Sequence, residues 1–410
     1  MEQDKIVITG VGVIAPNGIG KENFWEALRR GKNGIKPITI FDTAPYKAKL
    51  AGEIYDFDPA AVLGPKGLRD IDRATKLLCS SAKLALDDAN LVVNDSNTDK
   101  IGVCTGTTLS SLGNLTEFNR QVIKDGPLFT DVGLFPGTVI NAASSHVSIR
   151  FNIQGFNSTI SNGFTSSLDA LKYAADFIKF GKADVILLCG VESLNLTSFC
   201  GLLKIGFLAG INGPEISCPF DRRRNGMVIG EGAAVLILES ETHAKKRNAN
   251  IYCEVKSATN RFSLGQSTEK KISTTDIRKC MHAAITAAGV LENEIDFISA
   301  NANSTNDQDK TEALAIKETF NDTCRNIPVS SIKSMVGETY SASGALQLAA
   351  AIGNITNNFI NPILNFEKSD IECSLDFVSN AARQVKLNTV LVNNFGPEGN
   401  CASAVISRYK

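Results

Sequence analysis

The amino-acid sequence predicts an α/β protein built from two similar halves. Two successive series of β-branched, apolar segments alternate with segments of helical periodicity, and no linker rich in Pro, Gly or Ser separates the two series. Residues 157–178 and 329–352 also share one pattern, a short strand followed by a glycine-containing turn and a helix of small residues. We therefore predict a duplicated α/β unit, with one half over residues 1–245 and the other over residues 246–410.

The predicted strands show little alternation of apolar and polar residues, which is typical of strands covered on both faces. In the first half, strands are predicted near residues 5–9, 101–105, 184–190 and 233–239, and helices near 21–30, 73–89 and 166–180. In the second half, strands are predicted near 251–257, 295–299, 327–330, 388–393 and 402–407, and helices near 275–289, 309–319 and 343–355. The 410 residues are enough for each half to bury a core.

Composition argues against several classes of function. A net charge of −1 gives no electrostatic reason to expect binding to nucleic acid or to a membrane surface. The apolar runs are far shorter than a membrane span, and the N-terminal segment enters a strand directly, which predicts neither a signal nor a transit peptide. Ten cysteines spread singly along the chain indicate buried, reduced thiols in the cytoplasm. With three histidines and no cysteine cluster, we expect no bound metal.

The N-terminal segment IVITGVGVIAPNGIG looks at first like a strand entering a dinucleotide-binding loop. The spacing of that motif fails, because Ala15 stands where the third glycine is required. The sequence therefore predicts that these glycines form a tight turn instead.

Residues 157–190 are predicted to form a strand, a sharp turn, a helix and a second strand. Many α/β enzymes place a nucleophile on such a turn, at a helix N-terminus and close to backbone amides. Here the tip of the turn consists of Asn162, Gly163, Phe164 and Thr165. A phenylalanine cannot act as a nucleophile, so the turn has the geometry expected of an active site without the chemistry.

Six segments, in matched order, carry a family resemblance. They are VITGVGVIAPNGIGKENFWEAL, FGKADVILLCGVES, CPFDRRRNGMVIGEGAAVLILE, NSTNDQDKTEALAIKETF, SSIKSMVGETYSASGAL and LVNNFGPEGNCASAVI. Together they resemble the β-ketoacyl-acyl-carrier-protein synthases of the elongating type, members of the thiolase-like superfamily. The resemblance runs nearly end to end and implies the thiolase-like fold, with duplicated α/β halves in a layered αβαβα arrangement.

In that family an acyl chain moves from a carrier protein onto a cysteine at the turn, where the helix N-terminus lowers the thiol pKa. Two histidines then stabilise the enolate formed by decarboxylation, and two backbone amides hold the oxyanion. The resemblance places Phe164 at the cysteine position, and Asn301 and Glu338 at the histidine positions. Pro397 stands where the second oxyanion amide is expected, and proline has no N–H to donate.

Three polar residues of the family pattern are retained, namely Asp309, Glu312 and Lys333, and we expect them to form a structural cluster beneath the former site. Glu338 beside Lys333 is expected to form a buried ion pair, the alternative being a new general acid/base pair. For Phe164 two hypotheses stand. Its ring fills a vacated pocket as part of the core, or it plugs the acyl tunnel or contacts a partner's acyl chain.

Leu109, Leu112, Leu115 and Phe118 follow a predicted strand and recur at helical spacing. Ordinary helix packing explains such spacing. The resemblance offers a second explanation, because this segment lies at the dimer interface of the family and bounds the acyl cavity.

A ketosynthase-like chain without Cys-His-His resembles the chain-length factor, or β subunit, of type II polyketide synthases. This implies a heterodimer with a catalytic ketosynthase in aromatic polyketide or polyene biosynthesis. It also implies that an acyl carrier protein delivers acyl-phosphopantetheine to the partner, with no cofactor bound covalently here. Two alternatives are a repurposed enzyme using Glu338, Lys333 and Asn301, and a homodimeric acyl-binding scaffold. Those relatives usually carry glutamine at the cysteine position, so Phe164 is a departure from their pattern.

Overall fold

The computed structural model describes residues 4–264 and 272–410. In the first half the strands are β1 (Ile6–Ala15), β2 (Gly18–Ile19), β3 (Lys36–Pro37), β4 (Leu50–Ala51), β5 (Ile101–Gly106), β6 (Asn157–Ile160), β7 (Val185–Glu192) and β8 (Gly232–Ser240). The helices are α1 (Lys21–Arg30), α2 (Pro59–Leu63), α3 (Arg73–Asp88), α4 (Leu112–Asp125), α5 (Ala142–Phe151), α6 (Ser166–Lys179), α7 (Leu196–Lys204) and α8 (Glu241–Lys246).

In the second half the strands are β9 (Cys253–Phe262), β10 (Phe297–Ser299), β11 (Pro328–Ser330), β12 (Phe359–Ile360), β13 (Asp376–Phe377), β14 (Arg383–Gln384), β15 (Thr389–Phe395) and β16 (Asn400–Arg408). The helices are α9 (Thr274–Ala288), α10 (Asn306–Phe320), α11 (Lys333–Val336) and α12 (Ser343–Asn357). Four 3-10 turns also matter below, namely η2 (Pro127–Phe129), η3 (Val132–Thr138), η4 (Gly163–Thr165) and η7 (Tyr340–Ala342).

The two halves have the same strand order. Within the described residues the main sheet runs β13-β11-β10-β15-β16-β9-β1-β8-β7-β5-β6, with β2 beside β1. In the first half β6, β5 and β7 are parallel, and β8 and β1 follow in antiparallel pairing. In the second half β11, β10 and β15 are parallel, and β16 and β9 follow in the same way. Antiparallel pairing of β1 with β9 joins the two halves, so the predicted duplication is present.

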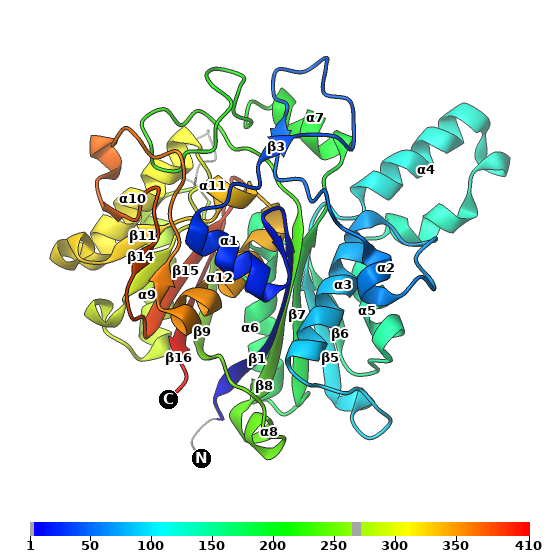
Figure 1. The fold of residues 1–410 in the computed structure, drawn as a ribbon, viewed down its shortest axis with the longest axis horizontal. Helices are drawn as coiled ribbons and strands as arrows, with labels where there is room; N and C mark the ends of the chain where they lie inside the picture. Colours follow the sequence, from blue (N-terminus) through cyan, green and yellow to red (C-terminus); the bar gives the residue numbers. More distant parts are fainter. Residues whose placement is uncertain (1–3, 265–271) are drawn as a thin grey trace.

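The elements form alternating layers of helix and sheet (Figure 1). Helices α3 and α5 cover one outer face, and α9 and α10 cover the other. Helices α6 and α12 lie between the two halves of the sheet and contact both. The fold is thus the thiolase-like αβαβα arrangement that the sequence predicts.

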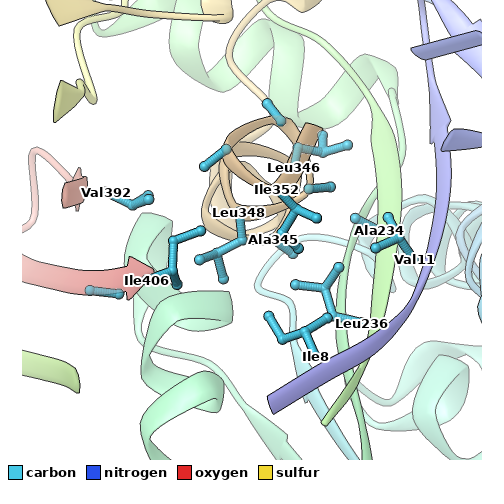
Figure 2. Close-up of a cluster of buried hydrophobic side chains, with 14 of the residues drawn as sticks. Ile8, Val11, Ala234, Leu236, Ala345, Leu346, Leu348, Ile352, Val392 and Ile406 are labelled. Carbon is cyan, nitrogen blue, oxygen red and sulfur yellow. The ribbon is translucent and has the colours of Figure 1, made fainter. Parts of the chain in front are cut away.

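Helix α12 is buried on every side, which explains why its sequence is small and apolar all round. Each residue from Ser343 to Ile355 is buried. Figure 2 shows side chains of α12 surrounded by those of both half-sheets, with Ile8, Val11, Ala234 and Leu236 from the first half and Val392 and Ile406 from the second. A single core cluster therefore crosses the boundary between the halves.

Helices α6 and α12 approach each other closely because small residues line their contact. A Cβ atom on Gly344 of α12 would lie 2.7 Å from Cγ of Leu168 in α6. Ser167 accepts a hydrogen bond from the Ala345 N–H at 3.0 Å. On its other side α6 contacts β5, where a Cβ atom on Gly106 would lie 2.3 Å from the Ser167 nitrogen. This packing fixes the position of the α6 N-terminus, where Phe164 lies.

The expectation that the N-terminal glycines form a tight turn is wrong for Gly10 and Gly12. Both lie inside β1, where α3 packs directly against the strand. A Cβ atom on Gly12 would lie 2.0 Å from the Ser81 carbonyl oxygen, and one on Gly10 would lie 2.5 Å from the Ala85 carbonyl oxygen. These glycines therefore allow α3 to approach β1 closely and do not form a turn.

Among the described residues, no helix combines the length and apolarity needed to cross a bilayer.

Replacing Gly12 with alanine is expected to destabilise the protein by roughly 1–3 kcal/mol, since the added methyl group overlaps the α3 backbone. Gly201→Ala in α7 is the control, because no atom lies within 4 Å of a Cβ there. The control is expected to be neutral or to stabilise by roughly 0.5–1 kcal/mol. Thermal or urea unfolding of both variants measures the difference, and equal midpoints would contradict this account of Gly12.

Candidate functional site

Phe164 lies in η4, immediately before α6, and its side chain is buried with 9% exposure. Gly163 precedes it with φ of 70°, a left-handed conformation that favours glycine. The Phe164 ring packs edge-on against Tyr340, with 5.4 Å between ring centroids and an interplanar angle of 74°. Two aromatic rings therefore occupy the space in front of the turn, where the family has a thiol and its acyl group.

The aromatic pair belongs to an apolar cluster assembled from distant parts of the chain. Its buried members are Ile38, Ala48, Ala51, Phe164, Leu194, Phe199, Leu208, Met227, Ile229 and Tyr340. Leu109 packs against this cluster from the segment after β5. Tyr340 is buried with φ of 49°, and its hydroxyl has no hydrogen-bond partner among the described residues. The chain's own side chains thus pack around the Phe164 ring.

Asn301 and Glu338, at the two histidine positions, are joined by Lys333. The Lys333 ammonium donates to Asn301 Oδ1 and to Glu338 Oε2, each at 2.8 Å. The Lys333 and Glu338 side chains are only 2% and 0% exposed. The two positions that correspond to the family's histidines thus carry an amide and one partner of a buried ion pair, and both charged groups are shielded from solvent.

Glu338 accepts hydrogen bonds from four donors, three of which the sequence interpretation missed. Asn303 Nδ2 donates to Glu338 Oε2 at 2.9 Å. The Tyr340 N–H and the Ser343 hydroxyl donate to Oε1 at 3.0 and 2.7 Å. Together with Lys333, these groups surround both oxygens of the buried carboxylate with donors. In contrast, the Nδ2 group of Asn301 is buried and has no partner among the described residues.

Glu312 and Asp309 fix the backbone that carries Asn301. Glu312 accepts hydrogen bonds from the N–H groups of Asn301 and Ala302 at 2.9 and 2.8 Å. Asp309 accepts them from Asn303, Ser304 and Phe220. Burial raises the pKa of Glu312 to about 7 and that of Asp309 to about 6, while these N–H donors act in the opposite direction. Both carboxylates bind backbone, so their role in this structure is to hold a loop.

The turn between β15 and β16 faces the α6 N-terminus. Pro397 in this turn has no N–H, so it cannot supply the second oxyanion amide. The next residue, Glu398, reaches back and accepts the Phe164 N–H at Oε1, with an N···O distance of 2.6 Å. Burial raises the pKa of Glu398. Sequence interpretation missed Glu398. The available signal was an acidic residue between Gly396 and Gly399, in a loop that the resemblance places opposite the turn.

A cavity of about 370 Å³ opens beside this turn and ends at Pro397. Its lining residues include Phe207, Asn225, Gly226, Ile272, Thr305, Gln308 and Pro397. Neither Phe164 nor Asn301 nor Glu338 is among the residues that line it. The cavity therefore reaches the position of the second oxyanion amide at Pro397, but not the positions that correspond to the nucleophile and the two histidines.

The spacing of Leu109, Leu112 and Leu115 predicts a single helix face, but α4 begins only at Leu112. Leu109 lies in the turn before it because the buried Glu192 carboxylate holds the N–H groups of Thr108 and Leu109, at 2.7 and 2.9 Å. Burial raises the pKa of Glu192 to about 7.

No residue of α4 is buried in the isolated chain. Leu115 is 38% exposed, whereas Leu112 and Phe118 are half-buried, and Phe118 contacts Phe135 of η3 with 5.8 Å between ring centroids. Packing within this chain therefore accounts for part of the Phe118 contact but leaves Leu115 exposed.

The histidines and Cys401 do not replace the catalytic groups that the family has at the turn. The histidines lie elsewhere, His146 in α5, His243 in α8 and His282 in α9. Cys401 is buried in β16, and burial raises its pKa. Within the described residues no three His, Cys, Asp or Glu side chains form a group that could hold a metal ion.

Comparison with known proteins gives the family. The model of the β-ketoacyl synthase N-terminal domain matches residues 3–244, and that of the C-terminal domain matches residues 252–367. The chain therefore belongs to the β-ketoacyl synthase family.

Relatives within the family include 3-oxoacyl-[acyl-carrier-protein] synthases and polyketide synthase subunits. The chain is 36% identical to 3-oxoacyl-[acyl-carrier-protein] synthase 2 of Coxiella burnetii, over 100% of this chain and 99% of that protein. It is 34% identical to the tetracenomycin polyketide synthase ketoacyl synthase alpha subunit of Streptomyces glaucescens, over 100% and 98%. Among solved structures, the ishigamide ketosynthase/chain length factor matches with a TM-score of 0.93 at 30% identity, covering both chains completely.

Replacing Lys333 with methionine is expected to cost roughly 3–5 kcal/mol, because it leaves Glu338 as an uncompensated buried charge. The double variant Lys333→Met/Glu338→Gln should recover part of the loss, since it removes both charges. Lys310→Met is the matched control, as it breaks an exposed ion pair with Glu372 and should cost under about 1 kcal/mol. Thermal unfolding compares the three variants, and equal midpoints for Lys333→Met and Lys310→Met would refute the structural role of the buried pair.

Proposed function

We propose that this chain is a non-catalytic chain-length factor that forms a heterodimer with a catalytic ketosynthase in type II polyketide or related polyene biosynthesis. The single observation that carries the proposal is the state of the turn before α6. Phe164 stands at the position of the nucleophile, its ring is buried against Tyr340, and its N–H is bonded by Glu398. A β-ketoacyl synthase scaffold with this turn lacks the means to form a thioester.

The remaining catalytic positions support the same proposal. Lys333 donates to both Asn301 and Glu338, and a carboxylate has no hydrogen to donate to an enolate. The Nδ2 group of Asn301 has no partner among the described residues, but it is buried and Asn301 does not line the cavity beside the turn. The burial of this network also argues against a repurposed enzyme built on these three residues. The contribution of the chain is then expected at a surface shared with a partner.

The strand β6 offers an open edge for such a surface. It ends the main sheet and pairs only with β5 among the described strands. The carbonyl oxygens of Phe156 and Ile160 accept hydrogen bonds from the β5 side. Because strand residues alternate, the backbone groups of Asn157 and Thr159 point to the open edge. An unpaired edge of this kind is suited to continuing the sheet into a second subunit.

Beside this edge lies a large apolar surface, which we call the flap and define as α4, η2, η3 and the residues between them. Its strongly exposed apolar residues are Ile123, Leu128, Phe129, Val132 and Phe135. Figure 1 shows α4 projecting from the body of the molecule, near α3 and α5. Exposed apolar surface on this scale marks an interaction site.

The nature of the partner rests on similarity. The solved ishigamide ketosynthase/chain length factor covers this chain completely. A second solved structure, a type II polyketide synthase acyl-carrier protein in complex with its ketosynthase bound to the hexaketide, matches at a TM-score of 0.91 and 27% identity. We propose by analogy that a carrier protein brings the acyl-phosphopantetheine arm to the ketosynthase partner, in the cytoplasm, and that α4 borders the tunnel for the growing chain.

Co-expression with an intact Cys-His-His ketosynthase from the same source tests the pairing. The expected result is a 1:1 complex in size-exclusion chromatography that Phe129→Asp disrupts, because a charge in an apolar interface is costly to bury. Phe180→Asp is the matched control, since Phe180 is 73% exposed and Phe129 is 80% exposed, but Phe180 lies outside the flap at the end of α6. A homodimer that forms in place of the complex would support the acyl-binding scaffold and overturn the heterodimer.

Truncation of α4 side chains tests the role in chain length. Leu112→Ala and Phe118→Ala in the complex are expected to lengthen the products by one or more two-carbon units, because a packed tunnel wall has no spare volume. Leu291→Ala, an exposed leucine of the second half, should leave product length unchanged. Mass spectrometry of the products beside thermal melting of each complex gives the answer. Less stable complexes that make unaltered products would exclude a length-setting role for these residues.

A further inference from the structure

We propose that Glu398 is a built-in occupant of the oxyanion site, whose carboxylate takes the hydrogen bond from the Phe164 N–H and excludes acyl groups from the turn on its own. The inference rests on the proposed function in one respect, the correspondence of the Phe164 N–H to the oxyanion amide of the family. Glu398 would then close the turn to acyl groups for a second reason, independent of the missing nucleophile.

The Glu398 carboxylate is held over the turn by the geometry of the β15–β16 connection. The Gly396 N–H donates to the Asn400 carbonyl at 3.0 Å, and the Gly399 N–H donates to the Gly396 carbonyl at 3.1 Å. These bonds close a tight turn with Glu398 at its tip. The side chain then folds back toward α6, where Oε1 lies 2.6 Å from the Phe164 nitrogen.

The carboxylate fits because the residues around it have no side chain. A Cβ atom on Gly163 would lie 1.8 Å from Oε1 of Glu398. A Cβ atom on Gly396 would lie 2.2 Å from Oε2. The pocket that receives the two carboxylate oxygens is thus formed by two glycines, one from each half of the chain.

A second hydrogen bond fixes the same pair of loops. Asn400 Nδ2 donates to the Asn162 carbonyl at 2.8 Å. The Asn162 side chain in turn donates to Asp169 of α6 at 3.2 Å. The β15–β16 turn is therefore attached to the α6 turn at two points, the Asn162 carbonyl and the Phe164 N–H, and the side-chain bond of Asn162 ties this turn to α6.

The consequence is an oxyanion site that already contains an anion. The N–H groups at the first turn of a helix favour negative charge, so an ionised carboxylate suits this position. The oxygen of an acyl thioester would have to displace Glu398 to reach the Phe164 N–H, and Pro397 offers no N–H as a substitute. Restoring a cysteine at position 164 would accordingly leave the turn closed to acyl groups.

The charge of Glu398 can be measured through an introduced thiol. Phe164→Cys places a thiol beside the carboxylate, and Phe164→Cys/Glu398→Gln keeps the shape and an acceptor oxygen but removes the charge. A neighbouring anion raises a thiol pKa, so the thiol of the double variant should be alkylated by iodoacetamide about tenfold faster at neutral pH. The other charged groups near the turn, Glu338, Lys333 and Asp169, are identical in both variants. Superimposable pH profiles of alkylation would overturn the proposal.

Peptide mass spectrometry separates the introduced thiol from the ten native cysteines, all of which lie in the described residues and all of which except Cys200 are buried. The measurement uses the chain alone and does not depend on pairing. A negative result for the Glu398 contact can therefore be told apart from a failure of the chain to form a heterodimer.

A second measurement keeps Phe164 and covers the case in which the introduced cysteine disturbs folding. Glu398→Ala removes the acceptor of the Phe164 N–H, so hydrogen exchange in the peptide that contains Phe164 should become about tenfold faster at that amide. Glu372→Ala, at an exposed glutamate of the second half, is the control. Unchanged exchange in Glu398→Ala would show that the carboxylate does not hold the amide, and would overturn the proposal.

Discussion

The close contact of α6 with α12 and β5 is the constraint on which the rest of the structure depends. Gly344, Ser167 and Gly106 permit distances between backbones that larger side chains would prevent. Because α6 and α12 form the central layer, this contact sets how far apart the two half-sheets lie. It also fixes the two turns that precede these helices, which carry Phe164 and Tyr340. The scaffold thus holds both turns in place whichever side chains they carry.

The substitutions at the former catalytic positions depend on one another. A buried lysine needs a counter-charge, and Lys333 finds it in Glu338, while Asn301 supplies a neutral oxygen. A histidine at either position would leave the ammonium with fewer acceptors. Glu312 and Asp309 hold the loop beneath, whatever side chain stands at position 301. Asn301, Lys333 and Glu338 therefore form one polar network, and the residue at each position depends on the other two.

Most of the fold could be predicted from the sequence, because its causes are local or repeated. The apolar, β-branched strands and the small-residue helices of both halves lie where the pattern predicts them. Gly10 and Gly12 could not be placed by pattern, since their cause is the distant helix α3. The resemblance to the family identified Phe164, Asn301, Glu338 and Pro397 as departures from its pattern. It did not indicate which contacts these residues make.

What the sequence could not provide were the new partners that fill the site. The contact of Glu398 with the Phe164 N–H joins residues 234 positions apart, and no local pattern predicts such a contact. The pairing of Phe164 with Tyr340 likewise depends on how the two central helices meet. Leu109 was misplaced for a similar reason, since Glu192 from β7 holds its backbone outside α4.

The open edge of β6 beside the exposed flap has a consequence for the protein's life in the cell. An unpaired strand next to exposed aromatic side chains will add to another strand or to another apolar surface that it meets. If a heterodimer partner covers these surfaces, every copy made in excess of the partner carries them uncovered. Balanced synthesis of the two chains would then be a requirement for solubility as well as for assembly, and overproduction of this chain alone would favour self-association and degradation.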